Sequence, residues 1–244
     1  MKYRRKRTTR KRRFTRKYKL RGGQPLKVAI LLSGRIKGYT DVMKKIQEKY
    51  DTTIFCSLNK KNKSPYIQTF CDTFKIGDEQ LNLEPTVTPD WIPNLPRMFT
   101  ITSYDGAYSM FYHRYKVFEL CKAYSQKHNI KFDYVLFFRA DIQSSDTLEL
   151  IPLAPNTVYI PEGYDFEGGL NDLMAYGSME VMEKYSNLVN NIKKMCIEQK
   201  LLFHPESFVR KHLENEAITV VRFPYSLELN PARKDHVSAY NDNA

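Results

Sequence analysis

The sequence predicts an α/β fold in which an open, mostly parallel sheet carries helices on both faces of a single domain. One observation is the run from Tyr134 to Phe138, five consecutive apolar or aromatic residues, which is typical of a strand buried on both faces. Another is the alternation of strand-like and helix-like apolar segments along the chain. The length of 244 residues suits one large domain or two small ones and allows a full core.

The apolar patterns predict the elements in chain order. Strands are expected where short apolar runs end at polar or Gly-containing turns: 26–32, 51–59, 134–138, 158–160, a short strand after the loop at 163–172, and 218–223. Helices are expected where apolar residues recur every three to four positions: 39–50, 106–129, 179–202 and 205–215. On the long helix 106–129, His113 and Arg114 are assigned to the polar side.

Three stretches have a less definite pattern. Residues 66–74 fit either a short helix or a strand, and 148–153 is a short element that ends at prolines. Residues 77–103 contain four prolines and Trp91, the only tryptophan. A long irregular segment inside a domain is either functional or mobile, so this one is interpreted as a substrate-side lid or as a packed connector.

The net charge of +12 is concentrated at one end of the chain. Residues 1–23 contain 13 of the 39 Lys and Arg residues and no acid, which leaves 26 basic and 27 acidic residues for the rest. Because like charges repel, we expect 1–23 to be a disordered tail. It can act as a nuclear-localisation-like signal, contact nucleic acid or another polyanion, or remain a solvated segment with no specific partner.

Cysteine spacing and hydropathy bear on the compartment. Cys56, Cys71, Cys121 and Cys196 form no C-x-x-C pair, which argues against a zinc site and a disulfide framework. We therefore expect reduced thiols and a cytoplasmic protein. No apolar run approaches the roughly 20 residues of a transmembrane segment, and no secretory signal is expected. The predicted organisation is a basic tail at 1–23, a domain at 24–230 and a polar extension at 231–244.

Two candidate ligand sites follow predicted strands. Ser33, Gly34 and Arg35 lie between the first strand and a helix, an arrangement that presents backbone N–H groups to a phosphate, although a plain tight turn is an equal alternative. Arg139 and Asp141 close the strand that begins at Tyr134. Ligands of open α/β sheets bind outside the carboxyl ends of such strands, so Asp141 is a candidate for a metal or phosphate site; the alternative is a structural ion pair with Arg139.

Further carboxylates follow in the C-terminal half. Asp165, Glu167 and Asp172 lie within eight residues, and Glu206 opens the helix 205–215, where it either complements the helix dipole or contacts an acceptor. Together with the phosphate-binding loop, this set suits transfer from a nucleotide-activated donor. A divalent metal, best held by Asp141, would neutralise a diphosphate leaving group. A carboxylate would deprotonate an acceptor hydroxyl; Asp172 is the best candidate, with Asp165 and Glu167 as alternatives.

Four stretches resemble the GT-A family of nucleotide-diphospho-sugar glycosyltransferases. They are ILLSGRIKGY (30–39), FYHRYKVFEL (111–120), YVLFFRADI (134–142) and NDLMAYGS (171–178), the last followed by MEKY (182–185) and HPE (204–206). The resemblance spans roughly residues 26–225 and is greatest to a group found in capsule-type bacterial loci and in large DNA viruses. It implies a GT-A-like, Rossmann-type sheet.

The resemblance also implies roles for particular residues. Asp141 matches the last acid of the family's DxD motif, which binds a divalent metal (Mn or Mg) and the donor diphosphate; Arg139 replaces the first acid, a form common in this group, and can itself pair with phosphate. Asn171 and Asp172 match positions near the donor sugar or acceptor. The implied donor-binding set is Ser33, Gly34, Arg35, Arg139, Asp141 and Asn171, and the catalytic set is Asp172, Asp165 and Glu206.

The implied partners are a nucleotide-sugar donor and a glycan or protein acceptor, in a host-cell cytoplasm or a virion if the protein is viral. The replaced first acid supports an alternative, a catalytically inactive GT-A-like binding protein attached to nucleic acid or a virion through its basic tail. A nucleotidyltransferase is a third, weaker interpretation, because no Lys-rich Gly loop is present.

Overall fold

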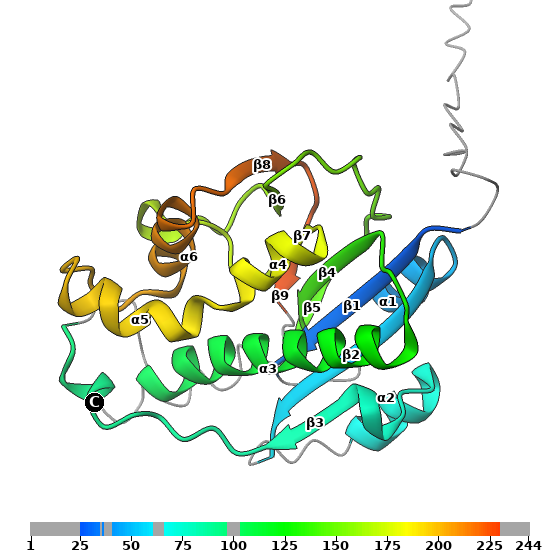
Figure 1. Ribbon diagram of the computed structural model, residues 1–244, viewed down its shortest axis with the longest axis horizontal. Helices are drawn as coiled ribbons and strands as arrows, with labels where there is room; N and C mark the ends of the chain where they lie inside the picture. Colours follow the sequence, from blue (N-terminus) through cyan, green and yellow to red (C-terminus); the bar gives the residue numbers. More distant parts are fainter. Residues whose placement is uncertain (1–24, 35, 37–40, 61–65, 97–102, 230–244) are drawn as a thin grey trace, which may run out of the picture.

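The structure is a computed structural model that describes residues 25–34, 36, 41–60, 66–96 and 103–229. The predictions for the tail 1–23, for Arg35 and for the extension 231–244 lie outside the described residues. Figure 1 shows a central sheet with helices packed against it. None of the helices in the described part of the chain is long and apolar enough to cross a membrane.

A seven-stranded sheet forms the centre of the molecule, in the order β3-β2-β1-β4-β7-β6-β8. Its strands are β1 (Lys27–Ser33), β2 (Asp51–Asn59), β3 (Leu81–Glu84), β4 (Tyr134–Arg139), β6 (Thr157–Pro161), β7 (Met174–Gly177) and β8 (Thr219–Phe223). β7 is antiparallel to both of its neighbours, and the other pairs are parallel. A separate antiparallel pair joins β5 (Ile142–Gln143) to β9 (Glu228–Leu229). The predicted α/β fold with an open, mostly parallel sheet is confirmed.

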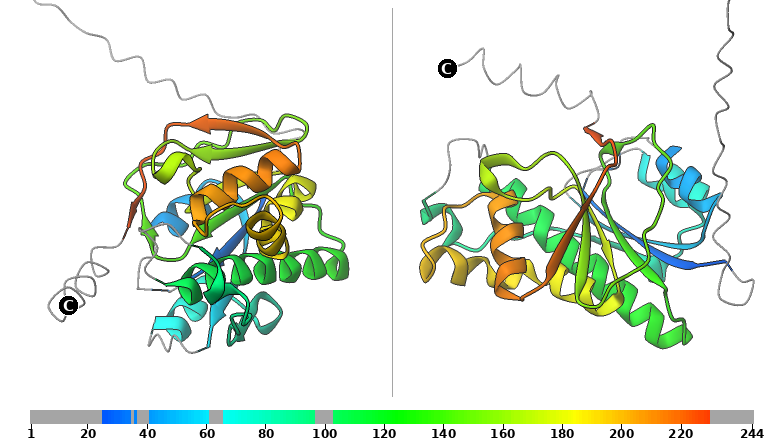
Figure 2. Two further views of the ribbon diagram at one scale, coloured as in Figure 1. Left: turned by 90° about the vertical axis from the view of Figure 1, so that its left-hand side faces the viewer. Right: turned by 90° about the horizontal axis from the view of Figure 1, so that it is seen from above.

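Helices cover both faces of the sheet (Figure 2). They are α1 (Asp41–Gln47), α2 (Tyr66–Phe74), α3 (Tyr104–His128), α4 (Met179–Ser186), α5 (Leu188–Ile197) and α6 (Pro205–Asn215). One hydrophobic core lies between the sheet and α3 to α6, and the other lies between the sheet and α1, α2 and the apolar residues of 148–153 and 223–229. The sheet is therefore the middle layer of three.

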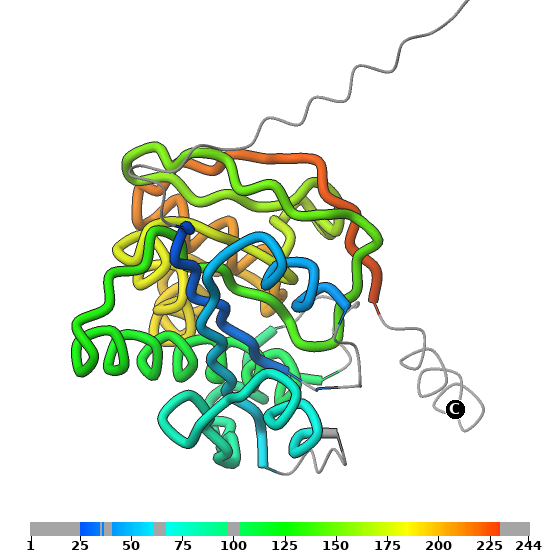
Figure 3. Tube along the Cα trace, turned by 90° about the vertical axis from the view of Figure 1, so that its right-hand side faces the viewer, coloured from blue at the N-terminus to red at the C-terminus, as the bar shows by residue number. Residues whose placement is uncertain are grey.

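β4 shows why a continuous apolar run was required. Val135 and Phe137 enter the core beneath α3, whereas Leu136 and Phe138 enter the core on the α1 side, and all four are fully buried. Successive side chains of a strand point to opposite faces, so a strand covered on both faces is apolar at successive positions. The tube in Figure 3 shows β6 and β8 together at one edge of the sheet, away from β1.

The irregular segment 77–103 holds an element that the pattern did not reveal. β3 pairs in parallel with β2 at the sheet edge, between the 3₁₀ turns η2 (Asp78–Gln80) and η3 (Ile92–Asn94). Its residues are only partly buried, and Pro85 follows directly, so neither a buried run nor strict alternation is present. Trp91 packs against the core, with the Lys193 ammonium 5.8 Å from its ring centre. These contacts of Trp91 fit the interpretation of the segment as a packed connector.

Other boundaries differ from the prediction for local reasons. Residues 66–74 form helix α2, and 148–153 has no regular backbone pairing. The helix predicted over 179–202 is divided at Asn187, which caps the end of α4. Helix α3 begins two residues early because the Ser103 side chain accepts the Gly106 N–H, and it ends where Asn129 adopts a left-handed conformation.

Candidate functional site at the carboxyl edge of the sheet

The strand order reverses at the junction of β1 and β4. The chain runs from β1 outward to β2 and β3 and then returns to β4 on the other side of β1. Ser33 ends β1, Arg139 ends β4, and the two are register partners. Such a switch point is where open α/β sheets bind ligands, outside the carboxyl ends of the strands. The predicted donor-binding residues Ser33 and Arg139 are thus brought together.

The backbone at the end of β1 is closely packed against the end of β4. The Ala140 N–H donates to the Ser33 carbonyl oxygen at 2.8 Å. Gly34 has φ +111°, a conformation that favours glycine, and its Cβ position lies 3.5 Å from Arg139 Cγ. The Ser33 hydroxyl is buried and has no hydrogen-bond partner within the described residues. An unsatisfied buried hydroxyl at a switch point is a group that a ligand can satisfy.

Arg139 and Asp141 form a bidentate ion pair. Arg139 Nε donates to Asp141 Oδ1 at 2.6 Å and Nη2 donates to Oδ2 at 3.2 Å, and the side chains are only 12% and 14% exposed. Burial opposes the charge on Arg139, but Asp141, followed by Asp172 and Glu206, raises its pKa above the usual value. The pair is therefore a nearly buried unit at the switch point, in contact with solvent only at its edge.

Replacing one partner of this ion pair should lower the free energy of unfolding more than replacing both partners with apolar residues. We expect Arg139→Met to lower the free energy of unfolding by about 2 kcal/mol, because the nearly buried Asp141 carboxylate would lose both hydrogen bonds from the guanidinium. The double substitution Arg139→Met with Asp141→Leu should cost less than Arg139→Met alone. Urea denaturation measures both. A double variant that is no more stable than Arg139→Met would contradict a penalty from the uncompensated Asp141 carboxylate.

An acid pair faces this unit from other elements. Asp172 is 3% exposed and lies in the loop before β7, whereas Glu206 lies in the first turn of α6 and has a side chain that is 14% exposed. Burial and the neighbouring Asp172 raise the pKa of Glu206 to about 7, and Arg139 partly opposes this. Two carboxylates in one low-dielectric site cannot both ionise easily, so Glu206 titrates near neutral pH.

His204 positions Glu206. It is the N-cap of α6: its Nδ1 lies 3.0 Å from Ser207 Oγ and accepts the Ser207 N–H at 3.4 Å. Burial lowers the pKa of His204, which favours the neutral ring near pH 7. Because Nδ1 accepts the Ser207 N–H, the hydrogen of the neutral ring lies on Nε2, which is 3.4 Å from Glu206 Oε2. The imidazole therefore joins the helix cap to the carboxyl group.

Gly169 brings the acid-bearing loop against α6. An added Cβ at this position would lie 2.3 Å from the Glu206 carbonyl carbon and 2.6 Å from its oxygen. The Leu170 N–H donates to the same oxygen at 2.9 Å, and Arg210 Nη2 donates to the Gly169 oxygen at 3.2 Å. The absence of a side chain thus allows the loop that carries Asp172 to contact the backbone that carries Glu206.

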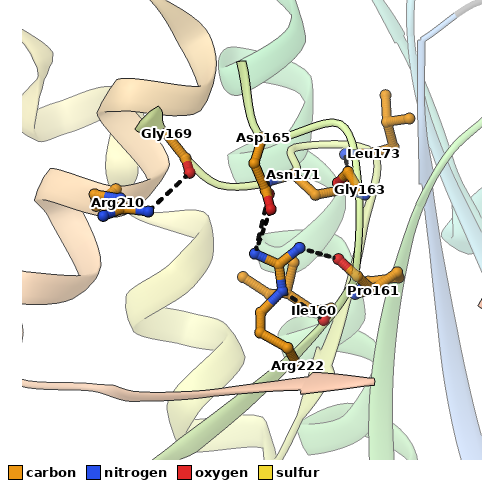
Figure 4. A network of polar contacts seen from close by, with 9 residues as sticks. All are labelled: Ile160, Pro161, Gly163, Asp165, Gly169, Asn171, Leu173, Arg210 and Arg222. Carbon is orange, nitrogen blue, oxygen red and sulfur yellow. Dashed lines mark hydrogen bonds and ion pairs between the residues drawn. The ribbon is translucent and has the colours of Figure 1, made fainter. Parts of the chain in front are cut away.

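The remaining predicted residues organise the loop itself (Figure 4). Asp165 accepts the Asn171 N–H at 2.9 Å and pairs with Arg222 of β8 at 2.9 Å. The Asn171 amide donates to the Gly163 oxygen and accepts the Leu173 N–H, so both ends of its side chain are engaged by backbone. The Asp165 side chain is 35% exposed, and its carboxylate acts on the site as one of the charges that raise the pKa of Glu206. The donor and catalytic roles of these two residues stay predictions.

Arg114 is a site residue that the sequence reasoning placed wrongly. It is fully buried, its Nη2 donates to the Asp172 carbonyl oxygen at 2.7 Å, and its guanidinium lies 4.4 to 5.0 Å from three aromatic ring centres: Phe111, Phe137 and Tyr185. The spacing signal was present, because Arg114 lies three residues from both Phe111 and Val117 on the buried stripe of α3. The charge of the side chain outweighed this spacing in the prediction.

His113 is also buried rather than on a polar face. Its ring lies between Ser57 Oγ, 2.9 Å from Nδ1, and Thr86 Oγ1, 2.8 Å from Nε2. Burial lowers its pKa to about 4, so it is neutral near pH 7. The cost of a buried imidazole is offset here by two hydrogen bonds, which join α3 to β2 and to the segment after β3.

A divalent metal fits this site only if a bound substrate supplies additional oxygen atoms to coordinate it. Within the described ranges there is no group of three or more His, Cys, Asp or Glu side chains that could hold an ion. Asp141 offers one carboxylate, whose oxygens already accept from Arg139. Mg²⁺ is commonly bound by one or two carboxylates together with substrate phosphates, and Asp141 is compatible with that arrangement.

The fold and site define an α/β protein whose polar side chains converge at the switch point of its sheet. No family model matches the chain. No curated protein matches it either. Its function is therefore argued from the site.

Proposed function

We propose that this protein is a glycosyltransferase that moves a sugar from a nucleotide-diphosphate donor to an acceptor hydroxyl. The observation that carries the proposal is the convergence of the Arg139–Asp141 pair with the acid pair Asp172–Glu206 at the junction of β1 and β4. A cation for the leaving group and a carboxylate that titrates near pH 7 are what this reaction requires.

The donor diphosphate would bind beside the end of β1. The Ser33 hydroxyl, which has no hydrogen-bond partner among the described residues, and the backbone at Gly34 lie at this strand end, and Arg139 is the register partner of Ser33 on β4. Arginine forms bidentate pairs with phosphate as readily as with carboxylate. Arg139 would therefore share its charge between Asp141 and the diphosphate as negative charge develops on the leaving oxygen.

The acid pair would activate the acceptor. Glu206 or Asp172 takes the proton of the acceptor hydroxyl, the oxygen bonds to the anomeric carbon, and the bond from that carbon to the diphosphate oxygen breaks. Glu206 is the better base near pH 7, because a group with a pKa of about 7 combines a usable ionised fraction with proton affinity. His204 Nε2–H would steady its carboxylate.

A bound Mn²⁺ or Mg²⁺ would add positive charge at the diphosphate, with Asp141 as its protein ligand. Among the described residues, the positive charge of Arg139 lies near three acids: Asp141, Asp172 and Glu206. A divalent ion would add positive charge to this acidic site. The cytoplasm is the proposed compartment, supported by four buried cysteines that form no disulfide.

Nucleotide binding tests the proposal. Thermal unfolding should shift upward with UDP or GDP, more with Mn²⁺ than without, because a ligand that binds only the folded state stabilises it. Asp141→Asn should remove the Mn²⁺-dependent part of the shift. Glu180→Gln, an exposed acid on α4, is the matched control. If no nucleoside diphosphate changes the unfolding temperature with or without metal, the transferase proposal fails.

The alternative, an inactive binding protein that uses residues 1–23, is supported by the excess charge of that segment and by Arg139, a cation in place of the first acid of the motif. It differs in its expected results: no nucleotide would bind, and polyanion binding with a steep salt dependence would disappear when 1–23 are deleted.

A further inference from the structure

A cavity separate from the acid pair lies beyond the carboxyl ends of β6 and β8. It has a volume of about 570 Å³ and is lined by the segment after β6 (162–166), the segment after β8 (224–227) and Asp146. Asp172 and Glu206 are not among its lining residues. It shares a loop with them, however, because residues 162–172 run from the cavity wall to the acid pair.

The lining combines aromatic rings with carboxylates. Tyr164, Phe166 and Tyr225 contribute rings, and Asp146 and Glu162 contribute acids; none of the described residues that line the cavity is basic. Tyr164 and Phe166 meet edge to face, with ring centres 6.2 Å apart, and Phe166 is 55% exposed. Two carboxylates without a cation repel phosphate and other anions. Rings beside hydrogen-bond acceptors suit a neutral ligand with an apolar face and several hydroxyls.

The cavity wall is built from hydrogen bonds within the protein. The Tyr164 hydroxyl donates to the Leu227 oxygen at 3.0 Å, and the Asn171 amide donates to the Gly163 oxygen at 3.0 Å. Asp146 Oδ2 accepts the Ser226 N–H at 2.9 Å. A Cβ at Gly163 would meet nothing within 4 Å, so the wall leaves open space there. Both edges of the cavity are thus formed before any ligand binds.

We propose that this cavity binds a neutral pyranose ring of the acceptor glycan, with a ring face against Phe166 and Tyr164 and sugar hydroxyls donating to Glu162 and Asp146. The assignment to the acceptor rests on the proposed transferase function. Its structural basis is that one loop forms the cavity wall at Gly163 and, through Asn171, fixes the backbone next to Asp172.

Saturation-transfer NMR with the full chain and no donor tests the binding step. The probes are the methyl glycosides of glucose, galactose, mannose and N-acetylglucosamine, with choline and glucuronate as cationic and anionic comparisons. At least one neutral glycoside should bind, and Phe166→Ala and Glu162→Gln should each weaken it about tenfold. Ile197→Ala removes an equally accessible apolar side chain on α5 and should leave binding unchanged. Both cavity positions are at the surface, so the fold should survive.

The outcomes separate this inference from the transferase proposal. Saccharide binding that Phe166→Ala weakens, in a protein that no nucleotide stabilises, supports the sugar site and overturns the transferase. Transfer activity whose acceptor KM is unchanged by Phe166→Ala and Glu162→Gln overturns the acceptor role of the cavity. Binding of choline or glucuronate in preference to every neutral glycoside, or binding of no probe, overturns the saccharide site itself.

Discussion

Gly169→Ala is expected to lower the free energy of unfolding by about 3 kcal/mol, near the upper end of overpacking effects. The new methyl group would lie 2.3 Å from the Glu206 carbonyl carbon, and backbone atoms cannot move aside as a flexible side chain can. The loop and the first turn of α6 would have to separate, which would break the Leu170 to Glu206 hydrogen bond. Urea denaturation monitored by circular dichroism measures the loss.

Gly77→Ala is the matched control for this experiment. Gly77 has an ordinary φ of −86°, and its nearest neighbour to an added Cβ, Gln80 Oε1, is 3.7 Å away. The same chemical change there should alter stability by less than about 1 kcal/mol. If the two variants were equally stable, the tight contact between the loop and α6 would not be a feature of the folded protein. Donor binding at Ser33 should survive in Gly169→Ala more fully than turnover, because the contact supports Glu206.

Glu206→Gln should lower kcat by about 10²- to 10⁴-fold if Glu206 is the general base. The activity of the wild-type protein should rise with pH through about 7 as Glu206 ionises, and the variant should lose that limb of the profile. Asp172→Asn should move the limb to lower pH, because it removes a charge that raises the pKa of Glu206. Glu180→Gln, which changes an exposed acid on α4, is the control and should keep both rate and profile.

The same substitution has a stability effect that needs no substrate. Below its unfolded pKa, near 4.5, Glu206 is protonated in both states; between that value and about 7 the folded state holds the proton more tightly. The wild-type protein should therefore lose about 1–3 kcal/mol of stability as pH rises from 4.5 to 7 through this group. Glu206→Gln should be more stable than the wild type at pH 8 and equal to it at pH 4. If the wild type were instead more stable than Glu206→Gln at pH 8, the folded protein would favour the ionised form of Glu206, contrary to a raised pKa.

Several elements could be predicted because their signals are local. β1, β2 and β4 contain runs of mostly apolar residues, because helices or loops cover both faces of these strands. The position of Asp141 at the end of β4 followed from the end of that run. β3 could not be found in this way, since an edge strand is only half buried and its identity depends on pairing with β2.

Individual residues of the site could be predicted from the sequence, but which of them lie close together in space could not. Asp172 and Glu206 were both candidates, but no pattern of residues along the chain shows that Asp172 lies close enough to raise the pKa of Glu206. Arg114 was assigned to the surface from its charge, whereas the rings around it and the Asp172 carbonyl oxygen make it an interior residue. Asn171 was predicted to bind the donor and Asp165 to act in catalysis, and both roles stay predictions. Only the tertiary structure revealed the hydrogen bonds by which these two residues also organise the loop.

The sequence by itself determined the class of fold, the buried central strand and the charge difference between residues 1–23 and the rest, because hydrophobic period and charge are properties of neighbours along the chain. Only the tertiary structure decided which carboxylates meet. Gly169 allows one loop to touch α6, and Arg139 is placed opposite Asp172 and Glu206. Burial and electrostatic coupling depend on distances in space, and those distances arise only when the sheet brings the ends of its strands together.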